Sequence, residues 1–263
     1  MAKQWSIVSW NVNSLRVRLP ALERWLAAHE PLVACLQETK VQDELFPVDP
    51  FTRLGYHVAF HGQKTYNGVA ILSRVPLEDV RPGFDGSGSE EQKRLLAATV
   101  LGVRVVNAYV PNGSEVGSPK FAHKLQFLAD LRAYCAEHAH EQRPLVLVGD
   151  FNVAPEPQDV FDPQEMENQV CFHPQERAAL AQVQACGLID VFRKLEPGPG
   201  HYTWWDYRQA GFRRNRGLRI DHVWATPALA GSALTCWIDK EERAKEKASD
   251  HAPLMATFER TVE

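Results

Sequence analysis

The segment from Pro144 to Asn152 places a carboxylate, Asp150, and a carboxamide, Asn152, directly after an apolar run of strand-forming residues. Such a run predicts a buried strand. If the strand begins at Leu145, alternation directs both polar side chains to the same side of its carboxyl end, where open α/β folds often place ligand crevices. Gly, Asp and Asn are also ordinary turn residues, so this segment alone leaves a simple loop open.

Four further polar sites follow or interrupt strand-like segments. They are Asn11, Glu38, Asp221 with His222, and Asp250 with His251. Any one of these Asp or Asn residues fits a helix cap or a turn. Together with Asp150 they resemble the site of a hard cation such as Mg²⁺, which takes oxygen ligands from one or two carboxylates, water and substrate phosphate. Such an ion does not require histidine, so we interpret His251 as a phosphate donor that a nearby carboxylate keeps protonated.

The composition is that of a soluble globular protein. The 263 residues are 44% hydrophobic and 24% charged, which suits one large domain or two small ones, and we expect a single domain over residues 1–263. No apolar run approaches the roughly 20 residues that cross a bilayer, and the chain enters a strand-like segment at once, so we expect a cytoplasmic protein without membrane contact. Five scattered cysteines without a CxxC pair argue against a disulfide framework and a zinc site.

Strand-like and helix-like segments recur without a low-complexity linker. Apolar patterns predict strands at 5–12, 32–37, 56–60, 69–73, 95–100, 103–110, 145–150, 202–205, 220–225, 234–238 and 253–258. Helices are predicted at 20–29, with proline in the first turn, and at 119–140 and 174–186. The strands between 56 and 110 indicate an antiparallel meander. Two packed sheets would bring the polar strand ends together.

Six segments resemble, in order, the motifs of the exonuclease III-type AP endonucleases. They are 9–16 (SWNVNSLR), 36–40 (LQETK), 107–113 (NAYVPNG), 149–155 (GDFNVAP), 219–222 (RIDH) and 249–253 (SDHAP), and segments 172–177 (FHPQER) and 202–207 (YTWWDY) resemble the bacterial branch. Six ordered motifs over nearly the whole chain are far more specific than any one. The resemblance implies a DNase I-like α/β fold: a single-domain, four-layer α/β/β/α sandwich of two mixed β-sheets flanked by helices, of the endonuclease/exonuclease/phosphatase type.

The resemblance further implies phosphodiester hydrolysis that depends on Mg²⁺ or Mn²⁺, with one or two ions. Glu38 would be the principal metal ligand and Asn11 its neighbour, in contact with metal-bound water or phosphate. Asp150 and Asn152 are further candidates for the metal site. Asp250 would bind the metal directly, bind it through water, or only support His251.

Catalytic roles follow from the same motif positions. Asp150 would position or deprotonate the attacking water, and Asn152 would orient that water and donate to the phosphate. His251 would donate to a non-bridging phosphate oxygen while Asp221 holds its imidazole, and Tyr109 would reach the phosphate or the departing 3′ oxygen. This division of labour suits in-line displacement at phosphorus, which depends on the placement of water, electrostatic donors and metal.

Other residues would select the substrate. A pocket for a flipped, baseless sugar favours apolar and aromatic walls, and the resemblance places Trp204, Leu218 and Ile220 there. The net charge of -4 does not indicate a nucleic-acid binder. A local arginine cluster fits either a solvated loop or, in this setting, contact with backbone phosphate. It contains Arg208, Arg213, Arg214, Arg216 and Arg219.

Two further segments are candidates for DNA contact. Lys120, His123 and Lys124 follow the loop at 111–118 and would touch the opposite DNA strand, or form a solvated helix start. His173 would face the DNA near the lesion, where its bulk would bias the balance between endonuclease and exonuclease activity.

The predicted function is a divalent-metal-dependent DNA repair nuclease. It would cut 5′ of abasic sites, or remove nucleotides and blocking groups from 3′ ends as a 3′–5′ exonuclease and 3′-phosphatase, and its partner would be double-stranded DNA bound by a monomer. The alternatives are a superfamily phosphatase acting on non-DNA phosphoesters, a catalytically silent nucleic-acid-binding regulator of the same fold, and a generic metal-binding scaffold. The joint presence of the five predicted active-site residues argues against the silent regulator. They are Glu38, Asp150, Asn152, Asp221 and His251.

Overall fold

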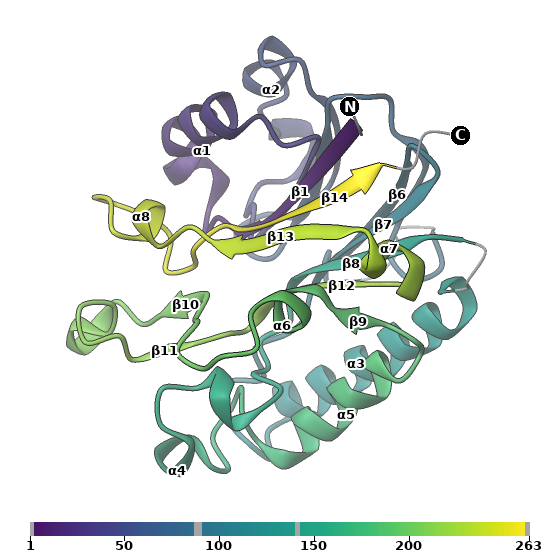
Figure 1. The fold of residues 1–263 in the computed structure, drawn as a ribbon. Coiled ribbons are helices and arrows are strands. Elements are labelled where there is room, and N and C mark those ends of the chain that lie inside the picture. Colours follow the sequence, from purple (N-terminus) through teal and green to yellow (C-terminus); the bar gives the residue numbers. More distant parts are fainter. Residues whose placement is uncertain (1–2, 87–90, 140–142, 261–263) are drawn as a thin grey trace.

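The computed structural model describes residues 3–86, 91–139 and 143–260, and arranges them in four layers of helix, sheet, sheet and helix (Figure 1). The predicted α/β sandwich of two mixed β-sheets is therefore confirmed. Among the described residues, no helix has the length and the apolar character that a membrane-spanning segment requires.

The first sheet combines strands from both ends of the chain in the order β13-β14-β1-β2-β4-β3. These strands span Ala233–Ile238, Leu254–Arg260, Lys3–Asn11, Val33–Gln37, Val69–Ser73 and His57–His61. β1 and β2 are parallel, with Asn11 opposite Gln37 at their carboxyl ends. β14 is antiparallel to β1, so the residues just before Leu254 lie near the same edge.

The second sheet comes from the middle of the chain, in the order β5-β6-β7-β8-β12-β9. These strands span Glu78–Pro82, Leu95–Val100, Val103–Tyr109, Leu145–Asp150, Asp221–Ala225 and Ile189–Asp190. Tyr109 lies opposite Asp150 in the parallel pair β7–β8, and Asp221 lies opposite Asp150 in the antiparallel pair β8–β12. Three polar strand ends therefore meet at one edge. A short pair, β10 (Trp204–Trp205) and β11 (Gly217–Leu218), is bridged to this edge at His251.

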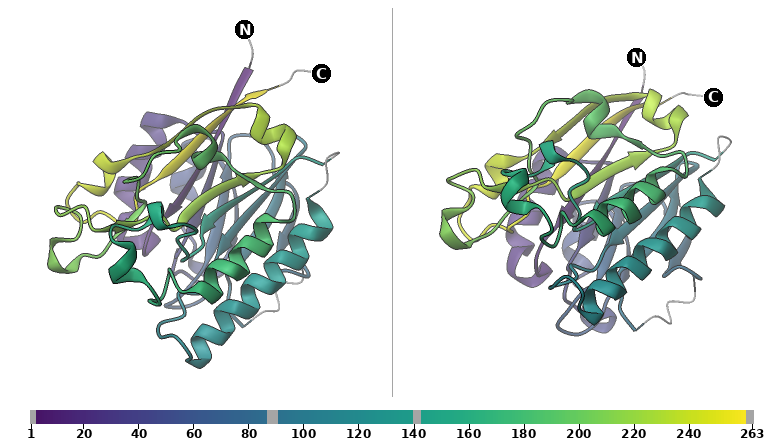
Figure 2. Two further views of the ribbon diagram at one scale, coloured as in Figure 1. Left: turned by 60° about the horizontal axis from the view of Figure 1, so that its bottom comes forward. Right: turned by 90° about the horizontal axis from the view of Figure 1, so that it is seen from below.

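Apolar side chains fill the three interfaces between the layers. One cluster lies between the two sheets, a second packs the second sheet against α3 (Pro119–His138) and α5 (Pro174–Gln184), and a third packs the first sheet against α1 (Leu15–His29) and α2 (Asp49–Arg53). Figure 2 shows α3 and α5 side by side on the outer face of the second sheet. The short helices are α4 (Pro163–Met166), α6 (Val191–Leu195), α7 (Pro227–Gly231), α8 (Lys240–Arg243) and three 3-10 turns at Asp43–Leu45, Pro157–Asp159 and Arg208–Ala210.

Gly149 allows β8 to approach β7 closely just before Asp150. Its φ is +144°, and a Cβ at this position would lie 1.8 Å from the carbonyl oxygen of Ala108. A residue with a side chain therefore does not fit here. The strand ends at Asp150, and Asn152 adopts a left-handed φ of 50°. Hydrogen bonds, and not the predicted alternation, thus bring Asn152 to the same site.

Several predicted elements differ from the structure. α1 begins at Leu15 and contains Pro20 in its interior, because its first residues donate backbone hydrogen bonds to the carbonyls of Glu38 and Thr39. Tertiary contacts here override the local proline signal. α3 ends at His138, and position 140 of its predicted extent lies outside the described residues.

The predicted meander between residues 56 and 110 is wrong. β3 and β4 belong to the first sheet, whereas β5, β6 and β7 belong to the second. The connection between β4 and β5 crosses from one sheet to the other. Local strand patterns do not show which sheet a strand joins, because both sheets bury apolar residues in the same way.

Candidate active site

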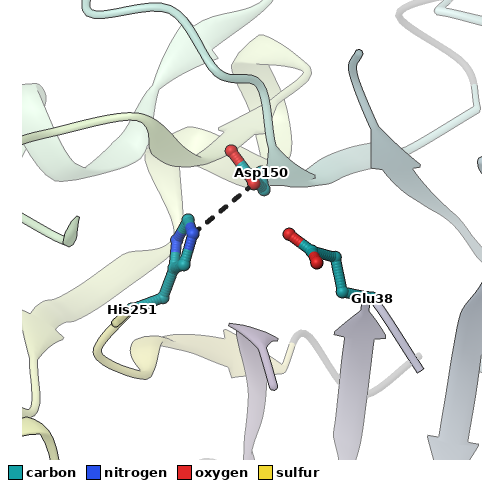
Figure 3. A group of neighbouring side chains, drawn as sticks. All are labelled: Glu38, Asp150 and His251. Carbon is teal, nitrogen blue, oxygen red and sulfur yellow. Dashed lines mark ion pairs between the residues drawn. The ribbon is translucent and has the colours of Figure 1, made fainter. Parts of the chain in front are cut away.

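Three side chains converge where the strand ends of the two sheets meet. Glu38 follows β2, Asp150 ends β8, and His251 precedes β14. One ligand atom from each lies within 4.8 Å of the others. Figure 3 shows the three side chains pointing toward one another, with His251 Nε2 3.7 Å from Asp150 Oδ2. The fold thus brings together residues that the sequence only placed at separate strand ends.

Asp221 orients the imidazole of His251. Its Oδ2 accepts a hydrogen bond from Nδ1 at 2.8 Å. Burial alone would lower the pKa of His251, but the carboxylates of Asp221 and Asp150 outweigh it, and the pKa is raised. Burial also raises the pKa of Asp150, an effect that His251 opposes. The site therefore holds a buried imidazolium with Nε2 on the side of Asp150.

Glu38 stays ionised in spite of its burial. Burial raises its pKa, but Lys40 and Asn11 more than compensate, so the pKa is lowered. Lys40 Nζ lies 2.8 Å from Oε2, and Asn11 Nδ2 donates to Oε1 at 2.8 Å. Glu38 and Lys40 both have a left-handed φ of 53°, a conformation that costs non-glycine residues about 1 kcal/mol or more. Tertiary contacts must therefore maintain this turn.

Asn11 joins two carboxylates. Its Nδ2 donates to Glu38 Oε1 and, at 2.9 Å, to Asp150 Oδ2. Its Oδ1, the atom that would bind a metal, accepts from the backbone N–H of Asn13 at 2.9 Å. This orientation favours a role of Asn11 in aligning the two carboxylates. It does not favour the predicted role of Asn11 as a metal ligand.

Asn152 is fully engaged by protein groups. Its Nδ2 donates to the carbonyl of Val110 at 3.0 Å and to Asp150 Oδ2 at 3.2 Å. Its Oδ1 accepts from Asn112 Nδ2 at 3.0 Å, and its backbone N–H donates to Asp150 Oδ1 at 2.9 Å. Asn152 therefore orients Asp150, while the predicted donation to phosphate would require one of these bonds to be exchanged.

Asp250 lies beside the site and not within the close group. Its Oδ1 accepts from Asn13 Nδ2 at 2.9 Å, and its Oδ2 accepts from Trp204 Nε1 at 3.0 Å. Burial raises its pKa, but the charge of His251 and these hydrogen bonds outweigh burial, and the pKa is lowered. Among the described residues, the three-membered carboxylate and histidine group does not include Asp250. This placement favours support of His251 and of the pocket wall over direct metal ligation.

Tyr109 is nearly buried at the end of β7 and lines the active-site cavity. Burial and the neighbouring Glu38 charge raise its pKa well above the ordinary value, so the phenol stays protonated. The guanidinium of Arg94 lies 4.5 Å from the centre of its ring, and Arg94 Nη1 donates to the Tyr109 carbonyl at 3.3 Å. The hydroxyl is thus a neutral donor at a fixed position.

A cavity of about 690 Å³ opens beside these residues. Its apolar wall contains Trp204, Leu218 and Ile220, as predicted. Trp204 pairs with Leu218 between β10 and β11, and the hydroxyl of Thr203 accepts the backbone N–H groups of residues 220 and 221. The adjacent Trp205 is fully buried, so alternation separates the two tryptophans as expected. The same short strands therefore hold the wall and the start of β12.

Comparison with known proteins matches residues 8–251 to the model of the Endonuclease/Exonuclease/phosphatase family. The chain belongs to this family. It is 39% identical to exodeoxyribonuclease III of Haemophilus influenzae, over 95% of this chain and 98% of that protein.

Among solved structures, an AP endonuclease from Archaeoglobus fulgidus matches with a TM-score of 0.93 and 43% identity, over 97% of this chain and 99% of that one. The 3′ phosphatase NExo from Neisseria, bound to product DNA hairpin, matches with a TM-score of 0.95 and 42% identity, over 97% of this chain and 100% of that one. The predictions of the family, the fold and a hydrolytic nuclease are confirmed.

The donor set fits the metal dependence of this family of nucleases. Glu38, which is partly buried, and Asp150, which is fully buried, supply carboxylate oxygens, which suit a hard divalent cation. His251 is bonded to Asp221 through Nδ1, and its raised pKa favours a hydrogen-bond donor over a metal ligand. Glu38 and Asp150 are therefore the residues that would hold the ion.

The arginine cluster divides into an outer and an inner part. Arg213 is exposed, and Arg208 lines the cavity while it pairs with Asp206 at 2.7 Å. Arg219 is fully buried, and its guanidinium bonds Asp159 and Asp190. The prediction of phosphate contact is wrong for Arg219, because the sequence does not show the two carboxylates that draw it inward.

The prediction of DNA contact is also wrong for Lys124. It is fully buried, and its Nζ donates to the carbonyls of Asn112 and Asn152 and to Glu176. Lys120 and His123, on the same helix, are exposed. A lysine one helical turn inside an amphipathic helix is drawn inward here by a carboxylate on the neighbouring helix.

His173 is the N-cap of α5. Its Nδ1 accepts from the backbone N–H of Gln175 at 3.3 Å, and its ring packs edge-on against Phe121. Of the residues described here, Cys171 lines the cavity whereas His173 does not. Its predicted influence on the choice of activity stays a prediction.

Sequence reasoning overlooked three residues that organise the site. Lys40 neutralises Glu38, Asn112 holds Asn152, and Arg94 packs on Tyr109. Lys40 and Asn112 lie inside the family-like segments 36–40 and 107–113, which was the available signal. Arg94 lies outside every such segment, so nothing in the sequence pattern pointed to it.

Proposed function

We propose that this nuclease acts on double-stranded DNA with Mg²⁺ or Mn²⁺, using one or two ions. It cuts the phosphodiester 5′ of abasic sites, or removes nucleotides and blocking groups from 3′ ends. The buried arrangement of Glu38, Asp150, Asp221 and His251 beside an apolar-walled cavity carries this proposal. The names of its relatives, which include an exodeoxyribonuclease and a DNA repair nuclease, support DNA repair as the function.

Each side chain has a proposed task. Asp150 positions the attacking water and accepts its proton, and Asn11 and Asn152 fix the orientation of Asp150. His251 donates from Nε2 to a non-bridging phosphate oxygen, and Tyr109 donates to the phosphate or the departing 3′ oxygen. Glu38 and Asp150 would hold a divalent ion, which would supply positive charge against the negative charge that develops on the phosphate oxygens. The protein groups contribute because they are prearranged in a buried site, where hydrogen bonds to developing charge are strong.

The cavity supports recognition of a baseless sugar. Trp204, Leu218 and Ile220 form an apolar wall next to the polar centre, and such a wall accepts a flipped sugar without needing to hydrogen-bond a base. Arg208, at the cavity, and Arg213, outside it, contact backbone phosphate. We further propose that residues 1–263 act as one catalytic domain in a monomer, and the cytoplasmic location stays a prediction.

The deciding experiment incubates the protein with three labelled duplexes, each in the presence of either Mg²⁺ or EDTA. One carries an internal abasic analogue, one a recessed 3′ hydroxyl and one a 3′ phosphate. We expect cleavage or trimming that EDTA abolishes. If the intact protein with Mg²⁺ acts on none of the three but binds them, the silent nucleic-acid-binding regulator replaces this proposal.

Two variants test the assigned residues in the same assay. Glu38→Ala and Asp150→Asn should each lose most turnover, because one removes a ligand of the ion and the other removes the base for the attacking water. DNA binding, measured by fluorescence anisotropy, should persist in both. A variant with near-normal turnover would displace the role given to that residue.

A further inference from the structure

A fully buried ion pair lies beneath the active site, between α3 and α5. Lys124 Nζ contacts Glu176 Oε1, and neither side chain is exposed to solvent. Taking two charges out of water is expensive, and a well-packed apolar pair is often equally stable or more stable. The contacts of this pair therefore deserve a specific explanation.

Both charged groups also bind backbone groups of the loops around Asn152. Lys124 Nζ donates to the Asn152 carbonyl at 2.7 Å and to the Asn112 carbonyl at 3.0 Å. Glu176 accepts from the backbone N–H of Cys171 at 3.2 Å and from that of His173 at 2.9 Å. The pair thus ties together the three loops after β7, after β8 and before α5.

Two of these backbone groups belong to residues in a left-handed conformation. Asn152 has a φ of 50° and Cys171 a φ of 73°, which is unfavourable for residues with a Cβ. Their side chains also touch, since Cys171 Sγ lies 3.9 Å from Asn152 Oδ1. The ion pair therefore holds the turn that directs Asn152 at Asp150.

Gly113 provides the room for this arrangement. It has a φ of 91°, and a Cβ there would come within 3.1 Å of Lys124 Cδ. A side chain at this position would push the lysine stem away from the two carbonyls. The loop that contains Asn112 is thus shaped around Lys124.

We propose that Lys124 and Glu176 are positioning residues for the hydrolytic step. They act through Asn152: Lys124 fixes its carbonyl, Glu176 fixes the adjoining Cys171 loop, and Asn152 in turn holds both oxygens of Asp150 by its side chain and its backbone N–H. This inference rests on the proposed nuclease function. Neither residue touches substrate, because both are buried.

A double substitution distinguishes a positioning role from a purely structural one, because in a purely structural pair the cleavage rate would recover together with stability. Lys124→Met alone strands the Glu176 charge in the interior and should destabilise the fold. Lys124→Met with Glu176→Gln removes both charges and should recover much of that stability. The double variant still lacks the Lys124 ammonium group that donates to the Asn152 carbonyl. A positioning role therefore predicts that stability returns while the cleavage rate does not.

The experiment measures the unfolding midpoint, DNA affinity and single-turnover cleavage of the abasic-analogue duplex. We expect both variants to lose on the order of 100-fold in rate, the loss typical of a displaced catalytic group, with near-normal DNA affinity. Lys194→Met is the control for loss of a lysine that binds a backbone carbonyl, because the ammonium of the exposed Lys194 donates to that of Ala230, away from the site. It should cleave at the wild-type rate.

A second readout is independent of cleavage. The side-chain amide NMR signals of Asn152 in the protein without DNA should shift or broaden in the double variant and stay unchanged in Lys194→Met. Recovery of rate together with stability in the double variant, or unchanged Asn152 signals, would overturn the positioning role. Absence of cleavage by the wild-type protein would instead refute the nuclease proposal and leave the NMR test standing.

Discussion

Two buried histidines, His251 and His222, lie in neighbouring ionic networks and have pKa values shifted in opposite directions. His251 bonds Asp221 and faces Asp150 in the active site. His222 is also buried, but its Nδ1 accepts from Arg219 at 3.1 Å and its Nε2 donates to the Val153 carbonyl at 3.0 Å. β12 separates the two networks, since alternation sends Asp221 to one face and the next residue to the other.

The pKa values of the two rings diverge because of their neighbours. Burial lowers both, as it disfavours any charged form. Carboxylates reverse the effect at His251, whose pKa is raised, whereas the Arg219 charge adds to it at His222, whose pKa falls to about 4. Burial alone therefore does not decide the charge of a histidine. Carboxylates around His251 favour its charged form, whereas the arginine beside His222 favours the neutral ring.

The largest expected effect comes from Asp221→Asn, which tests the active-site network. An amide in place of the carboxylate no longer stabilises the imidazolium, so single-turnover cleavage should fall on the order of 10³-fold. DNA affinity should stay near the wild-type value. Asp190→Asn removes a carboxylate from the other network and is the control, with lower stability but a nearly normal rate. A similar loss of cleavage rate in both variants would contradict the proposal that only the network of His251 takes part in catalysis.

The next effect concerns stability. Arg219→Met removes the cation that Asp159 and Asp190 share, while Asp159 keeps its ion pair with Arg193. Breaking a buried pair in this way should reduce the free energy of unfolding by about 3 to 5 kcal/mol. Urea denaturation followed by tryptophan fluorescence measures the change. A loss below about 1 kcal/mol, typical of surface ion pairs, would show that the buried network contributes little to stability.

A smaller effect is the pH dependence due to His222. Its pKa falls from 6.5 to about 4 on folding, so below pH 6.5 the unfolded chain binds a proton that the folded chain does not. Stability is therefore fully present above pH 6.5 and is lost as the pH falls toward 4, by about 2 kcal/mol between pH 8 and pH 5. His222→Gln should remove this part of the pH dependence. If the free energy of unfolding changed with pH by the same amount in wild type and variant across that range, the prediction would be contradicted.

The smallest effect is expected outside both networks. Arg213 is exposed on the segment whose Arg219 is buried. Arg213→Ala should weaken DNA binding a few-fold, and should reduce the slope of log affinity against log salt by about 1, without changing the cleavage step. Binding titrations at several salt concentrations measure the slope. An unchanged slope would place Arg213 away from the DNA.

The comparison also shows how far sequence reasoning reached. Glu38, Asp150 and His251 were predicted because each marks the end or start of a strand within an ordered motif, and strand ends of packed sheets meet at an edge. Lys124 and Arg219 were misassigned to the surface. Their partners, Glu176, Asp159 and Asp190, are remote in sequence. Glu176 lies in the family-like segment 172–177, but nothing in that segment shows that it pairs with Lys124, so the burial of the two cations was not predicted.

By itself, the sequence predicted the family, because six ordered motifs can be read along the chain, and through that resemblance it predicted the layered fold and the candidate residues of the active centre. Only the tertiary structure decided which charges lie inside and what state they hold. The pKa of a buried group depends on the charges within a few ångströms, and those come from other strands and helices. The two histidines are both buried, yet the pKa of one is raised and that of the other is lowered, because their neighbours differ.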